Sequence, residues 1–365
     1  MQVNKIIFTV TNDLVFDQRM NRICGSLTDS GYEVLLVGRK LKNSPLLTEK
    51  KYKQKRIRCF FNKGKLFYAE FNVRLFTFLL FKSADCLCAI DLDTILPVYY
   101  ISWIKRTRRV YDAHEYFSQL DEVVSRPPIY RFWKNIESKF IPRFKSGYTV
   151  CESIASEFKK NYGVKYDVIR NVPLQKDDFT VLSQPNTILY QGAVNRGRGL
   201  DKLALAMKNI EASLWICGDG NYMNELRSVV LENKLADKIV FFGMLKPEDL
   251  LEKTARAYIA VNPFDKRGLN QYFSLSNKFF DYIHASIPQV TMNYPEYARI
   301  NNEFNVAVLI DDLDPLTISS AINNLLTNKN LYIQLKENCK LAKSKLNWQT
   351  EEGRLLSFYK TLFDA

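Results

Sequence analysis

The stretch from Thr187 to Leu200 reads TILYQGAVNRGRGL and joins an apolar run to a glycine-rich loop. β-Branched and aromatic residues without strict alternation are typical of a strand that is covered on both faces, as in a parallel sheet. The residues that follow, Leu200–Asn209, have the spacing of an amphipathic helix. The stretch therefore predicts a strand–loop–helix unit of a parallel α/β sheet.

Similar apolar runs recur along the rest of the chain, six in each half. In the first half they are Lys5–Val10, Glu33–Gly38, Asp85–Asp91, Arg109–His114, Tyr148–Cys151 and Asp167–Arg170. In the second half they are Thr187–Gln191, Ser213–Cys217, Ile239–Phe242, Tyr258–Asn262, Gln289–Met292 and Val306–Ile310. Segments with helical spacing lie between them, so two doubly wound α/β domains are predicted.

The domain boundaries follow from this alternation and from composition. Residues 1–172 are expected to form one Rossmann-like domain and residues 186–345 a second. Residues 173–185 contain two prolines and no strong period, which is typical of a linker. Residues 346–365 are expected to form a C-terminal helix that packs back on the N-terminal domain.

Composition and charge exclude several classes of protein. The 365 residues are 47% hydrophobic and 25% charged, which is typical of a globular chain and not of a disordered or disulfide-dense one. The apolar stretch Leu75–Phe81 has seven residues, bounded by Arg74 and Lys82, and is too short to span a membrane. Seven scattered cysteines indicate reduced thiols, so we expect a cytoplasmic protein.

The positive charge is confined to one half. Residues 1–172 hold 30 Lys and Arg against 17 Asp and Glu, whereas residues 173–365 hold 22 of each. Lys50–Lys65 contains eight basic residues interleaved with aromatic ones, and Lys105–Arg109 forms a second group. An anionic membrane surface, a nucleic acid and a plain solvated face all remain possible interpretations of this pattern.

Two loops of the second half are suited to binding phosphate. Glycines at 192, 197 and 199 let the backbone approach a ligand, while Arg196 and Arg198 offer bidentate donors ahead of a helix. A plain strand–helix turn with solvated arginines explains the same residues. Gly218–Gly220 ends another strand with a glycine-flanked acid. No glycine follows the first strand of the chain, which disfavours a dinucleotide-binding fingerprint.

The segment Tyr272–Ile283 is the most informative for function. Ser274 or Ser276 is expected to cap a helix that begins near Asn277, so that the helix N-terminus and Lys278 face an anion. An acid one turn further on could accept hydrogen bonds from ribose hydroxyls. The apolar residues of this helix are expected to lie in the core.

These motifs resemble those of a known family. Gly192…Arg198-Gly199, Gly218-Asp219-Gly220, Phe242-Gly243 and Ser274–Ile283 fall in the order and spacing of retaining glycosyltransferases of family 4. In the first half, Asn12–Leu14 with Asp17–Arg19, Asp91–Thr94 and Tyr111–Glu115 resemble a bacterial branch of that family. The resemblance implies the GT-B fold, in which two Rossmann-like domains face a central cleft.

The resemblance also implies roles for individual residues. Arg198 matches the basic residue that neutralises the donor diphosphate, and Asp281 matches an acid on the nucleotide ribose. The family usually has an arginine where this chain has Ala193 and a glutamate where it has Phe273. The donor-binding candidates are Gly192, Asn195, Arg196, Gly199, Gly218, Asp219, Phe242, Gly243, Met244, Ser274, Leu275, Asn277 and Asp281.

In the first half, His114 matches a family histidine near the reacting sugar. The acceptor-side candidates are Asp13, Asp17, Arg19, Asp93 and Glu115, and the catalytic candidates of the whole chain are His114, Arg198 and Lys278. Asp91 and Asp93 have the form of a metal-binding pair, but helix capping or shaping of the acceptor site is the preferred interpretation. No metal and no cofactor is expected. His284 is interpreted as structural.

The resemblance implies transfer of a sugar from a UDP- or GDP-linked donor to a saccharide or lipid-linked acceptor, with retention of configuration. This chemistry favours a lipid surface over a nucleic acid as the partner of the basic half. We therefore expect a peripheral enzyme of surface polysaccharide or lipopolysaccharide synthesis on the inner face of the cytoplasmic membrane. A nucleotide-sugar epimerase acting on UDP-N-acetylhexosamine and a non-catalytic binding module remain alternatives.

Overall fold

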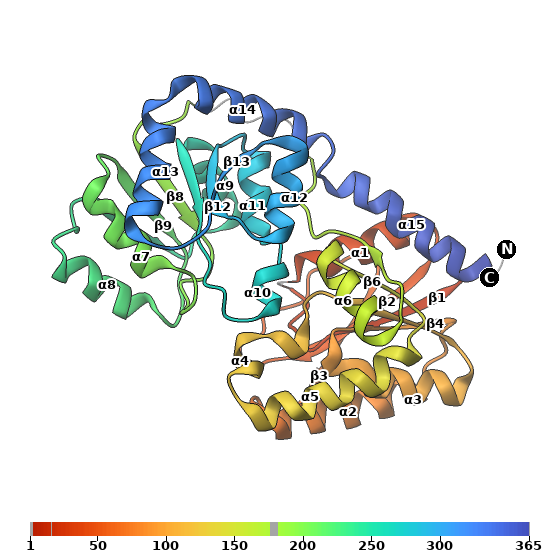
Figure 1. Cartoon of the computed structure of the whole chain (residues 1–365). Coiled ribbons are helices and arrows are strands. Elements are labelled where there is room, and N and C mark those ends of the chain that lie inside the picture. The colour runs from red at the N-terminus through yellow and green to blue at the C-terminus, as the bar shows by residue number, and fades with distance from the viewer. Residues whose placement is uncertain (1–2, 16, 176–181, 365) are drawn as a thin grey trace. The chain divides into compact units, whose positions relative to one another are not determined.

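The structure is a computed structural model that describes residues 3–15, 17–175 and 182–364. The chain forms two compact units (Figure 1). The first unit comprises Met1–Asn171 and Thr350–Ala365, and the second comprises Val172–Gln349. Within the expected linker 173–185, residues 176–181 lie outside the described part of the chain. Ala365 of the expected C-terminal helix does so as well.

The first unit is built on a seven-stranded parallel sheet of order β3-β2-β1-β4-β5-β6-β7. Its strands are β1 (Lys5–Thr9), β2 (Glu33–Lys40), β3 (Lys53–Arg58), β4 (Cys86–Ile90), β5 (Arg108–Ala113), β6 (Ser146–Thr149) and β7 (Asp167–Val168). Every residue of β4 is buried, because helices cover both faces of the sheet centre. The parallel sheet predicted for this half is confirmed.

Helices cover the two faces of this sheet. They are α1 (Gln18–Asp29), α2 (Gly64–Leu80), α3 (Ile95–Lys105), α4 (Asp121–Val124), α5 (Pro127–Phe140), α6 (Glu152–Tyr162) and α15 (Trp348–Asp364). Figure 1 shows α2, α3 and α5 side by side on one face, with α1, α6 and α15 on the other. Four short 3₁₀ turns, η1 (Leu92–Thr94), η2 (Phe117–Gln119), η3 (Ile141–Arg143) and, in the second unit, η4 (Met207–Asn209), complete the connections.

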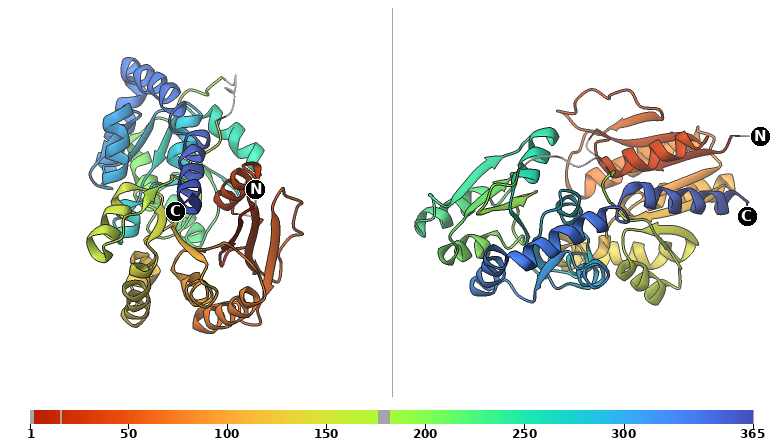
Figure 2. Two further views of the ribbon diagram at one scale, coloured as in Figure 1. Left: turned by 90° about the vertical axis from the view of Figure 1, so that its right-hand side faces the viewer. Right: turned by 90° about the horizontal axis from the view of Figure 1, so that it is seen from above.

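The helix α15 contributes directly to the core of the first unit. Tyr359 is fully buried, and its ring lies 6.1 Å from that of Phe8 on β1. Its hydroxyl is 3.4 Å from that of Tyr148 on β6. Glu351 accepts a hydrogen bond from the backbone N–H of Arg170 at 3.0 Å. Figure 2 shows this helix running along the sheet of the first unit beside α1.

The second unit is built on a six-stranded parallel sheet of order β10-β9-β8-β11-β12-β13. Its strands are β8 (Thr187–Gln191), β9 (Ser213–Cys217), β10 (Ile239–Gly243), β11 (Ile259–Asn262), β12 (Gln289–Met292) and β13 (Ala307–Ile310). Its helices are α7 (Leu200–Ala206), α8 (Met223–Glu232), α9 (Pro247–Arg256), α10 (Leu269–Phe273), α11 (Asn277–His284), α12 (Pro295–Phe304), α13 (Pro315–Thr327) and α14 (Lys329–Lys343). One large apolar cluster fills most of its interior.

The order of the strands locates the ligand-binding edge of each sheet. The chain order reverses beside β1 in the first unit and beside β8 in the second. In doubly wound sheets, ligands bind outside the carboxyl ends of the strands at such a reversal. The loops after β8 and β11 are therefore where a ligand of the second unit is expected. The described part of the chain contains no helix long and apolar enough to cross a membrane.

Candidate active site

Three strands of the second unit end in glycines that lie against one another. The N–H of Gly192 donates to the carbonyl of Cys217 at 2.9 Å, and that of Gly218 donates to the carbonyl of Gly243 at 2.7 Å. A Cβ on Gly218, which has a φ of 150°, would lie 1.9 Å from the carbonyl oxygen of Gly192. Only glycine fits there. We call Gly192, Gly218 and Gly243, which lie together at the carboxyl edge of the sheet, the glycine floor.

The loop after β8 is fixed by polar contacts to the loop after β9. The side-chain oxygen of Asn195 accepts from the N–H of Asn221 at 3.0 Å. The N–H of Val194 donates to the carbonyl of Asp219 at 3.0 Å, and the Asp219 carboxylate accepts from the N–H of Gly220 at 2.8 Å. Asn195 and Asp219 thus hold the two loops together.

Lys278, in the first turn of α11, is a buried cation without a hydrogen-bond partner. Its side chain is 8% exposed, and its Nζ has no partner in the described part of the chain. The Nζ lies 3.8 Å from the ring centroid of Tyr190, and a Cβ on Gly192 would lie 3.6 Å from it. Burial, followed by the charge of Arg198, lowers the pKa of Lys278 well below its ordinary value.

Arg198 approaches the same place from the loop after β8. Its guanidinium lies 4.6 Å from the ring centroid of Phe264, and the Nζ of Lys278 lies 5.1 Å from that same centroid. Gly199, with a φ of 63°, precedes α7 and packs against Pro263, where a Cβ would lie 3.1 Å away. Within residues 182–364, neither cation has an ion pair with a carboxylate.

Two like charges over one aromatic ring, one of them buried, destabilise a folded chain unless an anion joins them. The carboxyl edge of the second sheet therefore has the electrostatics of an anion-binding site. Its glycine floor admits a ligand close to the backbone, and the cation of Lys278 lies directly beside that floor.

Arg196 contacts α8 rather than Lys278. Its guanidinium forms an ion pair with Glu225 of α8 at 2.7 Å and lies 5.3 Å from the ring centroid of Tyr222. The guanidinium is largely solvated. The structure thus brings Arg198 to Lys278 but engages Arg196 with α8.

The start of α11 differs in one respect from expectation. The helix begins at Asn277 with Ser276 as its N-cap residue, yet the Ser276 hydroxyl does not cap it. That hydroxyl donates to Asn262 at 3.2 Å, and the hydroxyl of Ser274 donates to the carbonyl of Gln271 at 3.1 Å. Ser276 thus holds the predicted N-cap position, but it makes no capping hydrogen bond, because polar partners on β11 and in the preceding turn bind the hydroxyls of Ser276 and Ser274. Leu275 packs against the core.

Asp281 lies one turn after Lys278 and is oriented by a residue that the sequence motifs did not single out. The side-chain amide of Gln191 donates to Asp281 at 2.8 Å, and the Thr254 hydroxyl donates to the Gln191 carbonyl oxygen at 2.6 Å. Gln191 is buried at the end of β8. A polar side chain closing an apolar strand, directly before a glycine, is the signal that could have identified it.

A hollow of about 460 Å³ opens beside the glycine floor. It is lined by Asp219, Gly220, Asn221, Met223, Asn224, Arg227 and Gly243. Met244, next to it in sequence, is 77% exposed. Phe242 instead packs against Trp215 at 5.8 Å between centroids, on an apolar cluster. Of the expected base-binding edge, Gly243 lines the hollow and Phe242 supports it from within the fold.

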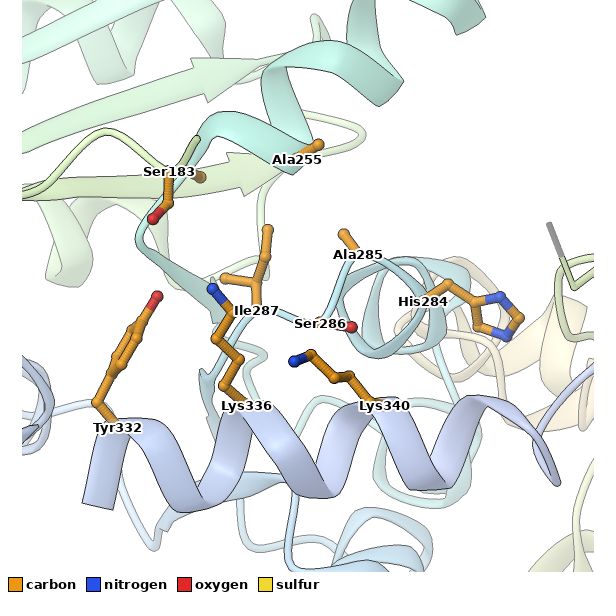
Figure 3. A pocket seen from close by; sticks show the side chains of 10 residues that line it. Ser183, Ala255, His284, Ala285, Ser286, Ile287, Tyr332, Lys336 and Lys340 are labelled. Carbon is orange, nitrogen blue, oxygen red and sulfur yellow. The ribbon is translucent and has the colours of Figure 1, made fainter. Parts of the chain in front are cut away.

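A second pocket, of about 270 Å³, lies at the other end of the strands (Figure 3). Ser286 and Ile287 immediately precede β12, and Ala257 precedes β11, so this pocket is at the amino edge of the sheet. Figure 3 shows Lys336 and Lys340 of α14 reaching into it. The Nε2 of His284, also beside it, donates to the carbonyl oxygen of Leu346 at 2.8 Å. This pocket contains none of the predicted donor-binding residues.

In the first unit, His114 follows β5 and contacts a buried ion pair. Its Nε2 lies 3.1 Å from the carboxylate of Asp112, which is fully buried. The other oxygen of Asp112 pairs with Arg19 at 3.1 Å, and Arg19 also donates to the carbonyl of Ile169. Burial is the largest single effect and lowers the pKa of His114, but the charge and the hydrogen bond of Asp112, with the charge of Asp91, together outweigh it, so the pKa is raised. Asp112 was not predicted as a site residue because it lies within a strand.

The carboxylates of Asp91 and Asp93, which follow β4, accept hydrogen bonds from neighbouring loops of the first unit. Asp91 accepts from the backbone N–H groups of His114 and Glu115 at 2.9 and 3.2 Å. Asp93 accepts from the hydroxyl of Thr11 at 2.5 Å, and burial raises its pKa to about 7. Asp91, Asp93, His114 and Glu115 thus gather at the carboxyl edge of the first sheet. In the described part of the chain, no group of three or more His, Cys, Asp and Glu is arranged to hold a metal.

Two further acceptor-side candidates make local contacts. Asp17 is the N-cap of α1 and accepts from the N–H of Met20 at 3.0 Å. Asp13 forms a buried ion pair with Arg56 at 3.2 Å and accepts a hydrogen bond from the Ser44 hydroxyl. Arg56 belongs to the basic segment 50–65, so part of that segment's charge is neutralised inside the fold.

Comparison with known proteins agrees with this geometry. Residues 173–342 match the family described as Glycosyl transferases group 1. This range spans the glycine floor, Arg198, Lys278 and Asp281. The match covers most of the second unit and none of the first. No curated protein is a significant match to the whole sequence.

Solved structures share the fold over nearly the full length. Sucrose-phosphate synthase from Thermosynechococcus elongatus is 15% identical, with 99% of each chain covered and a TM-score of 0.80. HepE from Anabaena in complex with UDP is 12% identical, with 98% of this chain and 100% of that one covered and a TM-score of 0.73. WaaG, a glycosyltransferase involved in lipopolysaccharide biosynthesis, is 14% identical, with 96% and 98% covered and a TM-score of 0.71. These structures share one fold, so the fold of this chain is GT-B: two α/β units, each built on a parallel sheet.

Proposed function

We propose that this protein transfers a glycosyl group from a UDP- or GDP-linked sugar to a hydroxyl of a saccharide acceptor, with retention of the anomeric configuration. One observation carries the proposal. Lys278 and Arg198 both lie against the ring of Phe264 beside the glycine floor, and neither forms an ion pair with a carboxylate in the described part of the chain. A donor diphosphate is the anion that fits two cations beside open backbone, and the domain match supports a nucleotide sugar.

The proposed reaction breaks the bond between the anomeric carbon and the β-phosphate oxygen of the donor. The acceptor oxygen bonds to that carbon on the same face, and the acceptor proton passes to the leaving phosphate. Negative charge grows on the phosphate as the bond breaks. Lys278, Arg198 and the N-terminus of α11 near Asn277 would stabilise that charge, which is the largest electrostatic contribution we assign.

Asp281 is proposed to hold the ribose hydroxyls, because Gln191 already orients its carboxylate beside the glycine floor. The hollow bounded by Asp219 and Gly243 is proposed for the base, with Met244 at its rim. Asn195 would act by fixing the loop rather than by contacting phosphate, since its oxygen is bonded to the loop after β9.

In the first unit, His114 is proposed to contact the reacting sugar. Asp112 and Arg19 lie beneath it and would fix its orientation. Asp93 and Glu115, at the same carboxyl edge, are proposed for acceptor hydroxyls. Asp13 and Asp17 would support this edge indirectly, because their carboxylates hold Arg56 and the start of α1.

The acceptor is proposed to be a saccharide carried on a lipid, in surface polysaccharide or lipopolysaccharide synthesis. The structural likeness to WaaG supports this assignment, since that protein is involved in lipopolysaccharide biosynthesis. The excess charge of the first unit supports an anionic membrane surface as partner, with the protein peripheral on its cytoplasmic face. We propose no metal and no cofactor, and full turnover in excess chelator is the result expected.

The test is binding and turnover with a panel of nucleotide sugars. A UDP- or GDP-sugar should raise the melting temperature, whereas a dTDP-sugar serves as comparison. Arg198→Ala should lower kcat by about 10²–10³-fold, the usual loss for a donor to a developing oxyanion. Lys202→Ala, an exposed substitution on α7, is the matched control and should leave kcat unchanged.

Two results would overturn the proposal. One is Arg198→Ala turnover within about twofold of the unmodified protein. The other is a panel in which no nucleotide sugar shifts the melting temperature, which would favour a non-catalytic binding module. Epimerisation or hydrolysis of UDP-N-acetylhexosamine without any acceptor would instead assign the epimerase.

A further inference from the structure

The helix α2 exposes apolar side chains along its outer face as well as its inner one. Phe67, Phe71, Leu75 and Leu79 are buried against the sheet. On the opposite side, Leu66, Val73 and Leu80 are 56%, 66% and 39% exposed. Residues seven apart lie on one side of a helix, so these three form a single outward stripe. A helix that is apolar all round requires a second apolar surface.

The end of α3 extends this stripe. The Nζ of Lys105, in the last turn of α3, donates to the carbonyl of Leu79 at 3.0 Å, which joins the C-terminal ends of α2 and α3. Next to this junction, Phe81 is 79% exposed and Trp103 is 65% exposed. Ile104 is exposed too. We call Leu66, Val73, Leu80, Phe81, Trp103 and Ile104 the outer apolar face.

The charge around the outer apolar face has one sign. The helices α2, α3 and α5 contain only two acids, and neither faces outward freely. Glu137 is 1% exposed and pairs with Lys134 at 2.8 Å. Glu70 accepts from the N–H of Phe61 at 2.9 Å and pairs with Arg74. Exposed cations on and beside these helices include Lys63, Lys65, Lys82, Arg106, Arg131 and Lys139.

The basic segment 50–65 is less suited to a membrane than its composition suggests. Lys51 pairs with Asp29 and Lys53 with Glu33, both at 2.7 Å. Tyr52 is buried, so it cannot enter a lipid interface. Phe60 and Phe61 of this segment are exposed, but exposed cations and exposed large apolar side chains also occur together at α2 and the end of α3.

We propose that the outer apolar face docks on an anionic phospholipid bilayer, with Phe81 and Trp103 entering the interface and Lys65 and Lys82 reaching lipid phosphates. Large apolar side chains surrounded by lysine and arginine are the chemistry of a surface-bound helix. The lack of outward acids gives the charge complementarity that selects a phosphate-rich surface. The proposal rests on the membrane partner proposed above and deepens it, but it is independent of the sugar-transfer chemistry.

Trp103 provides a direct reporter. The chain has four tryptophans, and Trp133, Trp215 and Trp348 are buried while Trp103 is exposed. Vesicles of phosphatidylcholine with phosphatidylglycerol should bind the full chain and shift its tryptophan emission to the blue, whereas phosphatidylcholine alone should bind it weakly. Trp103→Phe should remove the shift. Binding without any blue shift would place the contact on another surface and overturn the proposal.

Two sets of substitutions separate the contribution of apolar side chains to vesicle binding from that of charged ones. Val73→Ser with Phe81→Ser should weaken vesicle binding, whereas Ile333→Ser with Leu341→Ser, equally exposed on α14, should not. Lys65→Ala with Lys82→Ala should weaken binding by about 25-fold, since each basic residue near such a surface is worth about fivefold. Lys51→Ala with Lys53→Ala is the charge-matched control and should have a smaller effect.

Equal losses from the two lysine pairs would overturn the proposal, as would no vesicle binding at all. A dimer in lipid-free solution that Val73→Ser with Phe81→Ser dissociates would assign the face to a second copy of the chain instead. UDP-sugar binding measured on the same variants should stay unchanged. A failure of membrane docking is therefore distinguishable from a failure of the proposed function.

Discussion

Each unit buries a cation at the carboxyl edge of its sheet, but only the cation of the first unit forms an ion pair with a buried carboxylate. Arg19 in the first unit is 3% exposed and pairs with Asp112. Lys278 in the second unit is 8% exposed and has no hydrogen-bond partner in the part of the chain described. A paired buried charge is part of the fold, whereas an unpaired one is costly and is retained where a ligand completes it.

The largest effect is expected from removing the paired cation. Arg19→Met leaves the Asp112 carboxylate buried without its partner, which should lower the free energy of unfolding by about 3–5 kcal/mol. Urea denaturation measures this loss. The double variant Arg19→Met with Asp112→Leu should be less destabilised than Arg19→Met alone, because no unpaired charge remains. A loss below about 1 kcal/mol in the single variant would contradict the pairing.

Removing the unpaired cation should separate stability from activity. Lys278→Met keeps an unbranched apolar side chain beside Tyr190 but removes a desolvated charge, so the melting temperature without ligand should rise. Turnover should fall by about 10²–10³-fold, because the donor phosphate loses a cation. Lys343→Met, an equally buried lysine on α14, is the matched control and should leave turnover unchanged. A lower melting temperature for Lys278→Met would indicate that the fold, and not a ligand, requires its charge.

The two histidines extend the comparison to pH, with a smaller expected effect. Asp112 raises the pKa of His114 against the lowering effect of burial, whereas burial lowers that of His284. In NMR titrations the two should therefore lie on opposite sides of about 6.5. Asp112→Asn should lower the pKa of His114 and leave that of His284 in place. The variant His284→Gln removes the second of the two histidine signals and so identifies the signal of His114.

The sign of the linkage follows from the upward shift of His114. Protonated His114 contributes its full stabilisation below about pH 6.5, and this contribution is lost as the pH rises through the folded-state pKa. Stability of Asp112→Asn should therefore depend less on pH over that window. An unchanged dependence would show that Asp112 does not hold the proton on His114.

Most of the fold could be predicted from the sequence because parallel strands buried on both faces are apolar throughout. The strand β3 is the exception among the first seven. Its sequence KQKRIR carries four charges, since an edge strand has solvent on one side and exposes alternate residues. Its charges were therefore interpreted as a surface cluster alone. Helix α2 shows no clear helical period in the sequence, because it has apolar residues on both sides.

The candidate site could be predicted where chemistry depends on local sequence and not where it depends on contacts between distant segments. The glycines after β8 and β9, Arg198 and Lys278 are visible in short motifs. Gln191 and Phe264 acquire their roles only when β8, α11 and β11 come together. Ser276 shows the reverse case, because a good capping residue is diverted by Asn262 from a neighbouring strand.

The position of α15 sets the order in which the two cores can form. The first unit includes Thr350–Ala365, and Tyr359 fills space between Phe8 and Tyr148. Its interior therefore cannot close until those late residues have left the ribosome. The second unit, Val172–Gln349, is contiguous and has all its residues earlier. The core that begins with the first residues of the chain thus needs the last ones to be complete, and a fragment that stops at Asn171 would leave the Tyr359 site of the first core unfilled.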